Sequence, residues 1–242
     1  MMPVMPRPRI ARRSARRARR AALAVLAPVL LLLGPAGPAA AAGADAAGWP
    51  EPVPVVSHVD TADPVVFITL DDGWNHDPAA QRLLLDRQVP ATLFLLPGAY
   101  SYDPGYFRTL LDHGPSRVEN HTVNHPDLTT LPEAGQRSEL CGAREQALAR
   151  FGSEPRLARP PYGAYDATTR TVARACGSKA LVTWTYDFTT WGGVVPPTPV
   201  LRAGDIVLLH FNDTVAADLG RALGAADAAG LRPALLNSYV PE

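Results

Sequence analysis

The sequence predicts an α/β fold with a parallel sheet. Short apolar runs rich in β-branched and aromatic residues alternate with segments whose apolar residues recur at helical spacing, which is typical of consecutive β-α-β units. Polar residues able to do chemistry follow several of the short runs, as they do at the carboxyl ends of the strands in (β/α) barrels. No internal repeat is visible in the 242 residues.

The expected elements follow one another in regular order. The first strand is the run Val65-Val66-Phe67-Ile68, and the first helix, at 78–87, has apolar residues at helical spacing. The longest helical pattern, at 132–150, begins after Thr129-Thr130 and ends near Gly152. Further strands are expected at 91–96, 117–119, 157–158, 180–184 and 205–209, further helices at 104–113, 165–175 and 214–229, and a last segment at 233–236 closes the series.

Two adjacent carboxylates, Asp71 and Asp72, follow the first strand and precede Gly73. Successive strand side chains point to opposite faces, so neighbouring carboxylates serve one site only where the strand ends and the chain turns. Gly73 supplies such a turn. One carboxylate could then bind a metal while the other faces the group that the metal activates. An isolated Asp-Asp-Gly is more often an ordinary polar turn.

Two histidines, His121 and His125, lie four residues apart and are expected on the same side of a helical turn. With one carboxylate they form a set that suits Zn²⁺, or Co²⁺ or another divalent transition metal, with an open position for water. Most isolated His-x-x-x-His pairs bind no metal. The interpretation gains strength because further motifs follow in order: 159–163 (Arg-Pro-Pro-Tyr-Gly), 187–191 (Asp-Phe-Thr-Thr-Trp) and 208–210 (Leu-Leu-His).

From about Val65 to its end, the chain resembles the polysaccharide deacetylases of the NodB-homology type, carbohydrate esterase family 4. The best matched segments are 69–73 (Thr-Leu-Asp-Asp-Gly), 120–128 (Asn-His-Thr-Val-Asn-His-Pro-Asp-Leu) and 159–163, and 89–95 looks like the family's second strand. The resemblance implies a distorted, incomplete (β/α) barrel.

The resemblance also implies roles for individual residues. Asp72, His121 and His125 would hold the metal. Asp71 would be the general base with Arg159 as its charge partner, and His210 the general acid. The backbone N–H of Tyr162 would stabilise the oxyanion. Trp191 and Leu209 would line the pocket for the acetyl methyl. Pro161 would also contact the substrate.

One position departs from the family pattern. Thr190 precedes Trp191, where the family commonly has an aspartate that orients the acid histidine. The tuning of His210 is therefore expected to differ, unless a shifted loop brings Asp187 to this histidine. Three histidines match no motif and are expected at the surface: His58, His76 and His113. Of these, only His76 is expected near the site.

Residues 1–42 are expected to form a cleaved signal peptide. They contain eight arginines and no acidic residue, an apolar run at 21–33, and Ala40-Ala41-Ala42 as a cleavage site. The apolar run has 13 residues, whereas a spanning helix needs roughly 20, so neither an uncleaved anchor nor a basic nucleic-acid-binding arm is favoured. Sec and twin-arginine export both fit.

Removal of 1–42 leaves 15 basic and 23 acidic residues, a formal charge of −8. Such a chain is a poor ligand for nucleic acid or an anionic membrane. Residues 43–62 are expected to be a leader or linker and 63–242 the deacetylase domain, monomeric and without a stable membrane anchor. In an oxidising compartment, Cys141 and Cys176 are expected to pair, the alternative being two partly buried thiols.

These observations predict a secreted bacterial enzyme that uses a metal to remove acetyl groups from N-acetylated polysaccharide, such as peptidoglycan, chitin-like chains or poly-N-acetylglucosamine. Two alternatives stay open: an O-deacetylase acting on acetylxylan, and a carbohydrate-binding protein with a vestigial site. The identity of the sugar is not encoded in the motifs, because loops set that choice.

Overall fold

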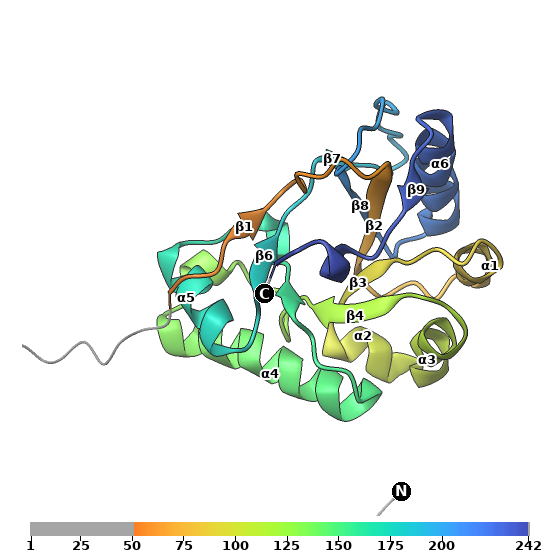
Figure 1. Cartoon of the computed structure of the whole chain (residues 1–242). Helices are drawn as coiled ribbons and strands as arrows, with labels where there is room; N and C mark the ends of the chain where they lie inside the picture. Colours follow the sequence, from red (N-terminus) through yellow and green to blue (C-terminus); the bar gives the residue numbers. More distant parts are fainter. Residues whose placement is uncertain (1–50, 242) are drawn as a thin grey trace, which may run out of the picture. The chain divides into compact units, whose positions relative to one another are not determined.

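The computed structural model of the protein describes residues 51–241 (Figure 1). The expected signal peptide and residues 43–50 of the expected linker lie outside the described residues. Within 51–241, no helix has the length and apolar character needed to cross a membrane.

A curled parallel sheet forms the centre of this region. Its strands pair in the order β1-β6-β5-β4-β3-β2-β8-β7, with β9 beside the start of β2, and every strand pairing among the described residues is parallel. The strands are β1 (Val55–Val56), β2 (Val65–Asp72), β3 (Thr92–Leu95), β4 (Arg117–Asn120), β5 (Leu157–Ala158), β6 (Ala180–Val182), β7 (Tyr186–Asp187), β8 (Ile206–His210) and β9 (Arg232–Pro233). Because β1 and β7 do not pair, the barrel stays open, which confirms the expected fold class.

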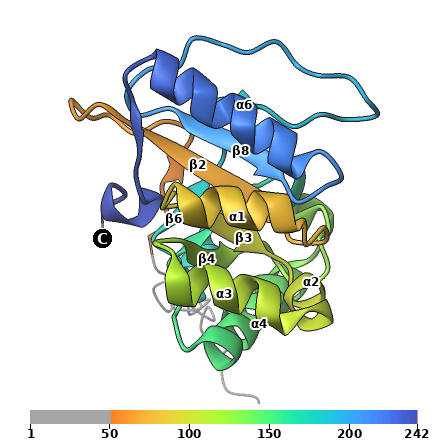
Figure 2. The same cartoon turned by 90° about the vertical axis from the view of Figure 1, so that its right-hand side faces the viewer.

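Helices cover the outer face of the sheet. They are α1 (Pro78–Asp86), α2 (Pro97–Tyr102), α3 (Pro104–His113), α4 (Glu133–Phe151), α5 (Ala167–Ala175) and α6 (Val215–Ala228), with short 3₁₀ turns at Leu128–Thr130, Pro161–Gly163 and Leu236–Ser238. Figure 2 shows α6, α1 and α3 side by side over β8, β2, β3 and β4. This outer layer matches the expected helices closely, and only α2 was not predicted.

Strand alternation divides the core into two faces. In β2, Ile68 and Leu70 pack outward against the helices, whereas Val65 and Phe67 pack inside the curl. The inner cluster also contains Leu236 and Val240, so the C-terminal segment packs inside the curled sheet against Val65 and Phe67, near the start of β2. The polar residues at the carboxyl ends of the strands therefore lie above a filled interior.

Residues 51–62, the described part of the expected linker at 43–62, belong to the folded domain, so that prediction was wrong for them. Val53 is fully buried, β1 pairs with β6, and His58 forms a bridge with Asp205. The carbonyl of Pro54 accepts a hydrogen bond from the backbone N–H of Leu181. An edge strand tolerates a proline because its N–H is not needed in the ladder, and two residues are too short to show strand periodicity in the sequence.

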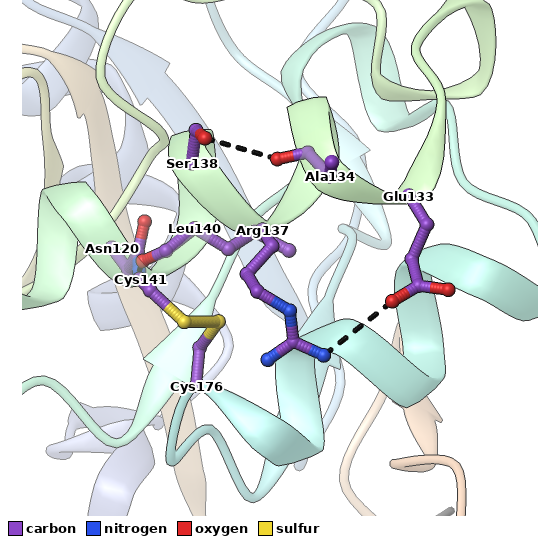
Figure 3. The surroundings of a disulfide bond; sticks show 8 residues. All are labelled: Asn120, Glu133, Ala134, Arg137, Ser138, Leu140, Cys141 and Cys176. Atoms are coloured by element: carbon purple, nitrogen blue, oxygen red, sulfur yellow. Dashed lines mark hydrogen bonds and ion pairs between the residues drawn. A yellow bond between two sulfur atoms is a disulfide. The ribbon is translucent and has the colours of Figure 1, made fainter. Parts of the chain in front are cut away.

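A disulfide joins Cys141 in α4 to Cys176 at the end of α5 on the outside of the sheet (Figure 3). Cys176 packs in a small core between these helices, and the bridge closes a separation of 35 residues.

Reduction of this disulfide should lower the free energy of unfolding by about 3 to 4 kcal/mol, because the unfolded chain regains the entropy of an open loop. Urea unfolding with and without reductant measures the change. The Cys141→Ser/Cys176→Ser variant is the control, since reductant should not affect it. Two thiols titrated in the unfolded, unreduced protein would contradict the pairing.

Candidate active site

The expected catalytic residues meet at the carboxyl ends of β2, β4, β5 and β8. β2 and β8 are paired in a register that sets Asp71 beside His210 and Thr69 beside Leu208. Residues paired across a parallel ladder share a face, so these four side chains form one wall at the top of the curl.

Asp72 joins Asp71 in one site because its backbone is left-handed, with φ of 71°. This conformation breaks the strand alternation at the last residue of β2. Gly73 follows with φ of 96°, and a Cβ there would lie 3.0 Å from Leu95 and 3.1 Å from Phe107. Only glycine fits both the conformation and the space, so the glycine holds the turn that brings the carboxylates together.

The two histidines converge in a different way from the one predicted. Residues 121–127 form a loop after β4, not a helical turn, and Thr122 and His125 have φ of 70° and 59°. These left-handed residues fold the loop back so that the rings of His121 and His125 lie 4.9 Å apart. A helical reading of the four-residue spacing was wrong, although the pairing of the histidines was right.

Three potential metal ligands face one another. The Nε2 atoms of His121 and His125 lie 3.4 and 3.5 Å from Oδ1 of Asp72, and ligand atoms of the three residues fall within 4.8 Å of one another. Oδ1 of Asp72 is buried and accepts no hydrogen bond. Buried polar atoms are rarely left without a partner, so this oxygen fits a site built for a cation.

The tautomer of His121 supports the same reading. Its Nδ1 lies 2.8 Å from the carbonyl oxygen of Arg159. A carbonyl only accepts, so Nδ1 carries the proton and Nε2 presents its lone pair toward Asp72. Metal-binding histidines are commonly oriented in this way by a second partner.

Burial and charge act against each other on these groups. Burial raises the pKa of Asp72, but the close contact with His121 and the charges of the nearby histidines outweigh it and leave the pKa below its usual range. Burial and then the charge of His121 lower the pKa of His125. Burial also lowers the pKa of His121, but Asp71 and Asp72 raise it above its usual value. The carboxylates thus create a strongly cation-attracting centre.

Arg159 forms a buried ion pair with Asp71. Its side chain is fully buried. Nη1 donates to Oδ1 of Asp71 at 2.7 Å and to Thr69 at 2.8 Å, and Nη2 donates to the carbonyl of Thr183 at 3.0 Å. The guanidinium also stacks 4.3 Å from the ring centre of Phe94. One oxygen of Asp71 is therefore occupied, while Oδ2 faces the metal ligands, 3.7 Å from Nε2 of His121.

The partner of His210 is Thr189, which the sequence reasoning missed. Oγ1 of Thr189 lies 2.8 Å from Nδ1 of His210. Thr190, on which the expected tuning rested, turns away and donates its hydroxyl to Asp218 at 2.6 Å. Asp187 contacts the loop by accepting from the backbone N–H of Thr189 at 2.8 Å, and within the described residues it makes no hydrogen bond to His210. A hydroxyl thus orients His210 through its second ring nitrogen.

A cavity of about 370 Å³ opens between these groups. Trp191 and Tyr162 line it and contact His210 and His125, with ring centres 4.7 and 4.8 Å apart. Tyr162 has φ of 60°, a strained value for a non-glycine residue. The complete lining is Asp71, Asp72, His121, His125, Pro160, Tyr162, Trp184, Asp187, Trp191, Leu208 and His210.

Two expected substrate-binding residues do not line this cavity. Leu209 belongs to the outer core, and Leu208 faces the cavity instead, because alternate residues of β8 point to opposite faces. Pro161 is buried and its neighbour Pro160 lines the cavity, since the chain turns at Pro161–Gly163.

Helix α4 supports the loop at 121–127, which we call the histidine loop, through a residue that belongs to none of the sequence motifs. Glu139 accepts hydrogen bonds from the backbone N–H groups of Val123 and Asn124 at 2.9 and 2.8 Å, and from the side chain of Asn124 at 2.7 Å. In addition, Asn120 donates to the carbonyl of Leu140 at 2.7 Å. A carboxylate facing successive loop N–H groups is visible only once the loop and helix are placed together.

One histidine expected at the surface is largely buried. The ring of His76 stacks 4.8 Å from that of Tyr106, and its Nε2 lies 2.8 Å from the carbonyl oxygen of Gly73. It therefore supports the turn after the two carboxylates and stands outside the ligand set.

The chain is similar in sequence to known polysaccharide deacetylases. The family model described as polysaccharide deacetylase matches residues 58–181. An uncharacterized protein of Streptomyces coelicolor is 40% identical over 193 residues, 77% of each chain. A chitooligosaccharide deacetylase of Sinorhizobium fredii is 33% identical over 160 residues, 62% of this chain and 73% of the relative.

A solved structure has a similar fold. A family 4 carbohydrate esterase from Streptomyces lividans, in complex with acetate, has a TM-score of 0.64 and 26% identity to this chain, covering 72% of this chain and 94% of its own. Together with the match to the family model, this likeness extends over most of the described residues. The chain therefore belongs to the polysaccharide deacetylases of the NodB-homology type, the metal-dependent carbohydrate esterase family 4.

Proposed function

We propose that this protein is a secreted bacterial deacetylase that removes acetyl groups from N-acetylated polysaccharide, such as peptidoglycan, chitin-like chains or poly-N-acetylglucosamine. One observation carries the proposal. Asp71, which Arg159 holds from behind the cavity wall, borders the same cavity as the Asp72, His121 and His125 set and as His210, whose second ring nitrogen contacts Thr189. A base, a cation site and a second proton-carrying group around one space suit acyl transfer.

Asp72, His121 and His125 would hold a divalent ion, Zn²⁺ or alternatively Co²⁺, since imidazole and carboxylate ligands suit such ions. When bound, this ion supplies Lewis acidity and lowers the pKa of water to about 7. Asp71 would take the proton of the attacking water on Oδ2, while Arg159 keeps Oδ1 in place.

The remaining residues would act on the acetyl group. The backbone N–H of Tyr162 would donate to the developing oxyanion, and Trp191 with Leu208 would enclose the methyl. His210 would pass a proton to the leaving amine, with Thr189 holding its ring. Acid and base groups placed in this way each contribute roughly 10²- to 10⁴-fold in rate.

The cleavable leader expected at 1–42 and the disulfide between Cys141 and Cys176 support export from the cytoplasm. Similarity to the chitooligosaccharide deacetylase of Sinorhizobium fredii supports an oligosaccharide or polysaccharide of N-acetylglucosamine as substrate. The experiment is acetate release from chitooligosaccharide, peptidoglycan and acetylxylan with added Zn²⁺ or Co²⁺. Release from acetylxylan alone would favour the O-deacetylase, and no release from any would favour a binding protein with a vestigial site.

Removal of one ligand should empty the metal site. The purified protein should carry about one divalent ion per molecule, and His125→Ala should lose most of the metal and of the activity. Metal analysis after dialysis measures this, with His113→Ala, at an exposed position, as the control. Unchanged metal content in His125→Ala would overturn the ligand assignment.

Removal of the hydroxyl beside His210 should weaken the proton donor. Thr189→Val keeps the shape but loses one hydrogen bond, so kcat should fall about 2- to 10-fold. In Thr189→Asp a carboxylate favours the charged imidazole, so the alkaline limb of the rate profile should move to higher pH. If neither variant differs from the parent in its pH profile, His210 is not the acid.

A further inference from the structure

We propose that Trp74 is a sugar-stacking platform that binds a neighbouring unit of a neutral N-acetylated glycan while the reacting acetyl group occupies the cavity beside His210. The inference rests on the proposed function, because it assumes that the reacting unit lies at Asp72. It assigns a residue that no part of the catalytic chemistry uses.

Three hollows meet at Asp72. The first is the cavity of about 370 Å³ described above. The second, of about 520 Å³, extends past His125 toward α2 and α4, and the third, of about 470 Å³, extends past His210 toward the loop after β8. If the acetylated unit of a glycan chain reacts at Asp72, the other two hollows are adjacent spaces that can receive its neighbouring units.

Trp74 stands between these two outer hollows. It lines both, and Asp72 is the one other residue that the two linings share. The indole is 56% exposed. A single exposed tryptophan needs no function, but here the flat apolar face lies two residues from the proposed metal ligand. The weakly positive C–H face of a pyranose ring can stack on the negative face of an indole.

The indole of Trp74 lies directly against the backbone at Gly98. A Cβ on Gly98, near the start of α2, would lie 2.9 Å from Cη2 of Trp74. No real Cβ sits so close, so any side chain at position 98 would push the ring away. Gly98 has no positive φ that would itself require glycine, so contact with Trp74 is the constraint that the structure shows at this position.

The polar groups around the platform suit a neutral ligand. The second hollow offers Asn124, Gln146 and Ser101, and the third offers Asn75, Asn212 and the carboxylate of Asp213. No lysine or arginine is among the described residues that line the three hollows. Amides and hydroxyls pair with sugar hydroxyls and N-acetyl groups, whereas an anionic glycan would find no lysine or arginine partner in these hollows.

The test compares a long ligand with a short one. For an N-acetylglucosamine pentasaccharide, Trp74→Ala should raise KM roughly 10-fold, while turnover of 4-nitrophenyl acetate, too small to reach Trp74, should stay within about twofold of the parent. Gly98→Val keeps the indole but displaces it, so it should act in the same direction. Tyr102→Ala, which removes an aromatic side chain that is 81% exposed and lines none of the three hollows, is the matched control.

Binding provides a readout that needs no turnover. In an Asp71→Asn background, calorimetric titration with the pentasaccharide should show the same roughly 10-fold loss on Trp74→Ala. Carboxymethylated chitin oligomers should bind more weakly than the neutral ones. Equal pentasaccharide affinity with and without Trp74, or tighter binding of the anionic oligomers, would overturn the proposal. Absence of acetate release by the parent, with binding still dependent on Trp74, would instead overturn the proposed function alone.

Discussion

Asp71→Asn is expected to lower turnover by about 10²- to 10⁴-fold while the protein keeps its metal. An asparagine matches the shape of the side chain and can still accept the hydrogen bond from Arg159, but it cannot take a proton. Asp72→Asn should behave differently, because it weakens the cation site whose buried Oδ1 has no other partner.

Metal analysis and acetate release on the same preparations separate the two roles. The base variant should retain about one ion per molecule, and the ligand variant should lose affinity and recover part of its activity at high metal concentration. Near-normal turnover in Asp71→Asn would mean that another group is the base. Equal metal loss in both variants would mean that the two carboxylates share the ion.

Arg159→Met should lower the free energy of unfolding by about 3 to 5 kcal/mol, because it leaves the Asp71 carboxylate, only 2% exposed, without its charge partner. Burial lowers the pKa of Arg159, and the charge of Asp71 opposes this shift. Urea unfolding of the chelated protein is the direct measurement, since a bound ion would partly replace the lost charge.

A second variant isolates the ion pair from the packing of the arginine. Asp71→Asn/Arg159→Met removes both charges, and it should be more stable than Arg159→Met alone. If the two variants unfold at the same urea concentration, the loss comes from packing against Phe94 and from the bonds to Thr69 and Thr183, and the ion pair contributes little to stability.

The sequence predicted the fold, and the grouping of Asp72, His121 and His125, from motifs that follow the strands. The β2 run before Asp71, the exact span of α3 and the motif order at the strand ends are visible in the chain itself. What failed depends on contacts between distant segments. Both faces of β8 are apolar, as is usual for a buried parallel strand, so the sequence does not tell whether Leu208 or Leu209 faces the site.

The adjacent hydroxyls at 189 and 190 pose the same difficulty. Which of them meets His210 is decided by Asp218 in α6, which accepts both the backbone N–H and the hydroxyl of Thr190 at 2.8 and 2.6 Å. The convergence of the histidines was predicted for the wrong reason, since it depends on left-handed residues at Thr122 and His125. Such conformations leave no mark in a residue pattern unless glycine occupies them.

Three consecutive residues of α4 connect the disulfide to the histidine loop. Glu139 holds the loop of His121 and His125, Leu140 accepts from Asn120, and Cys141 fixes the helix to the end of α5. The redox state of the compartment in which the chain matures should therefore affect the proposed metal site as well as folding. Protein produced in a reducing cytosol should emerge under-metallated, and its inactivity would then report the maturation route and not the catalytic residues.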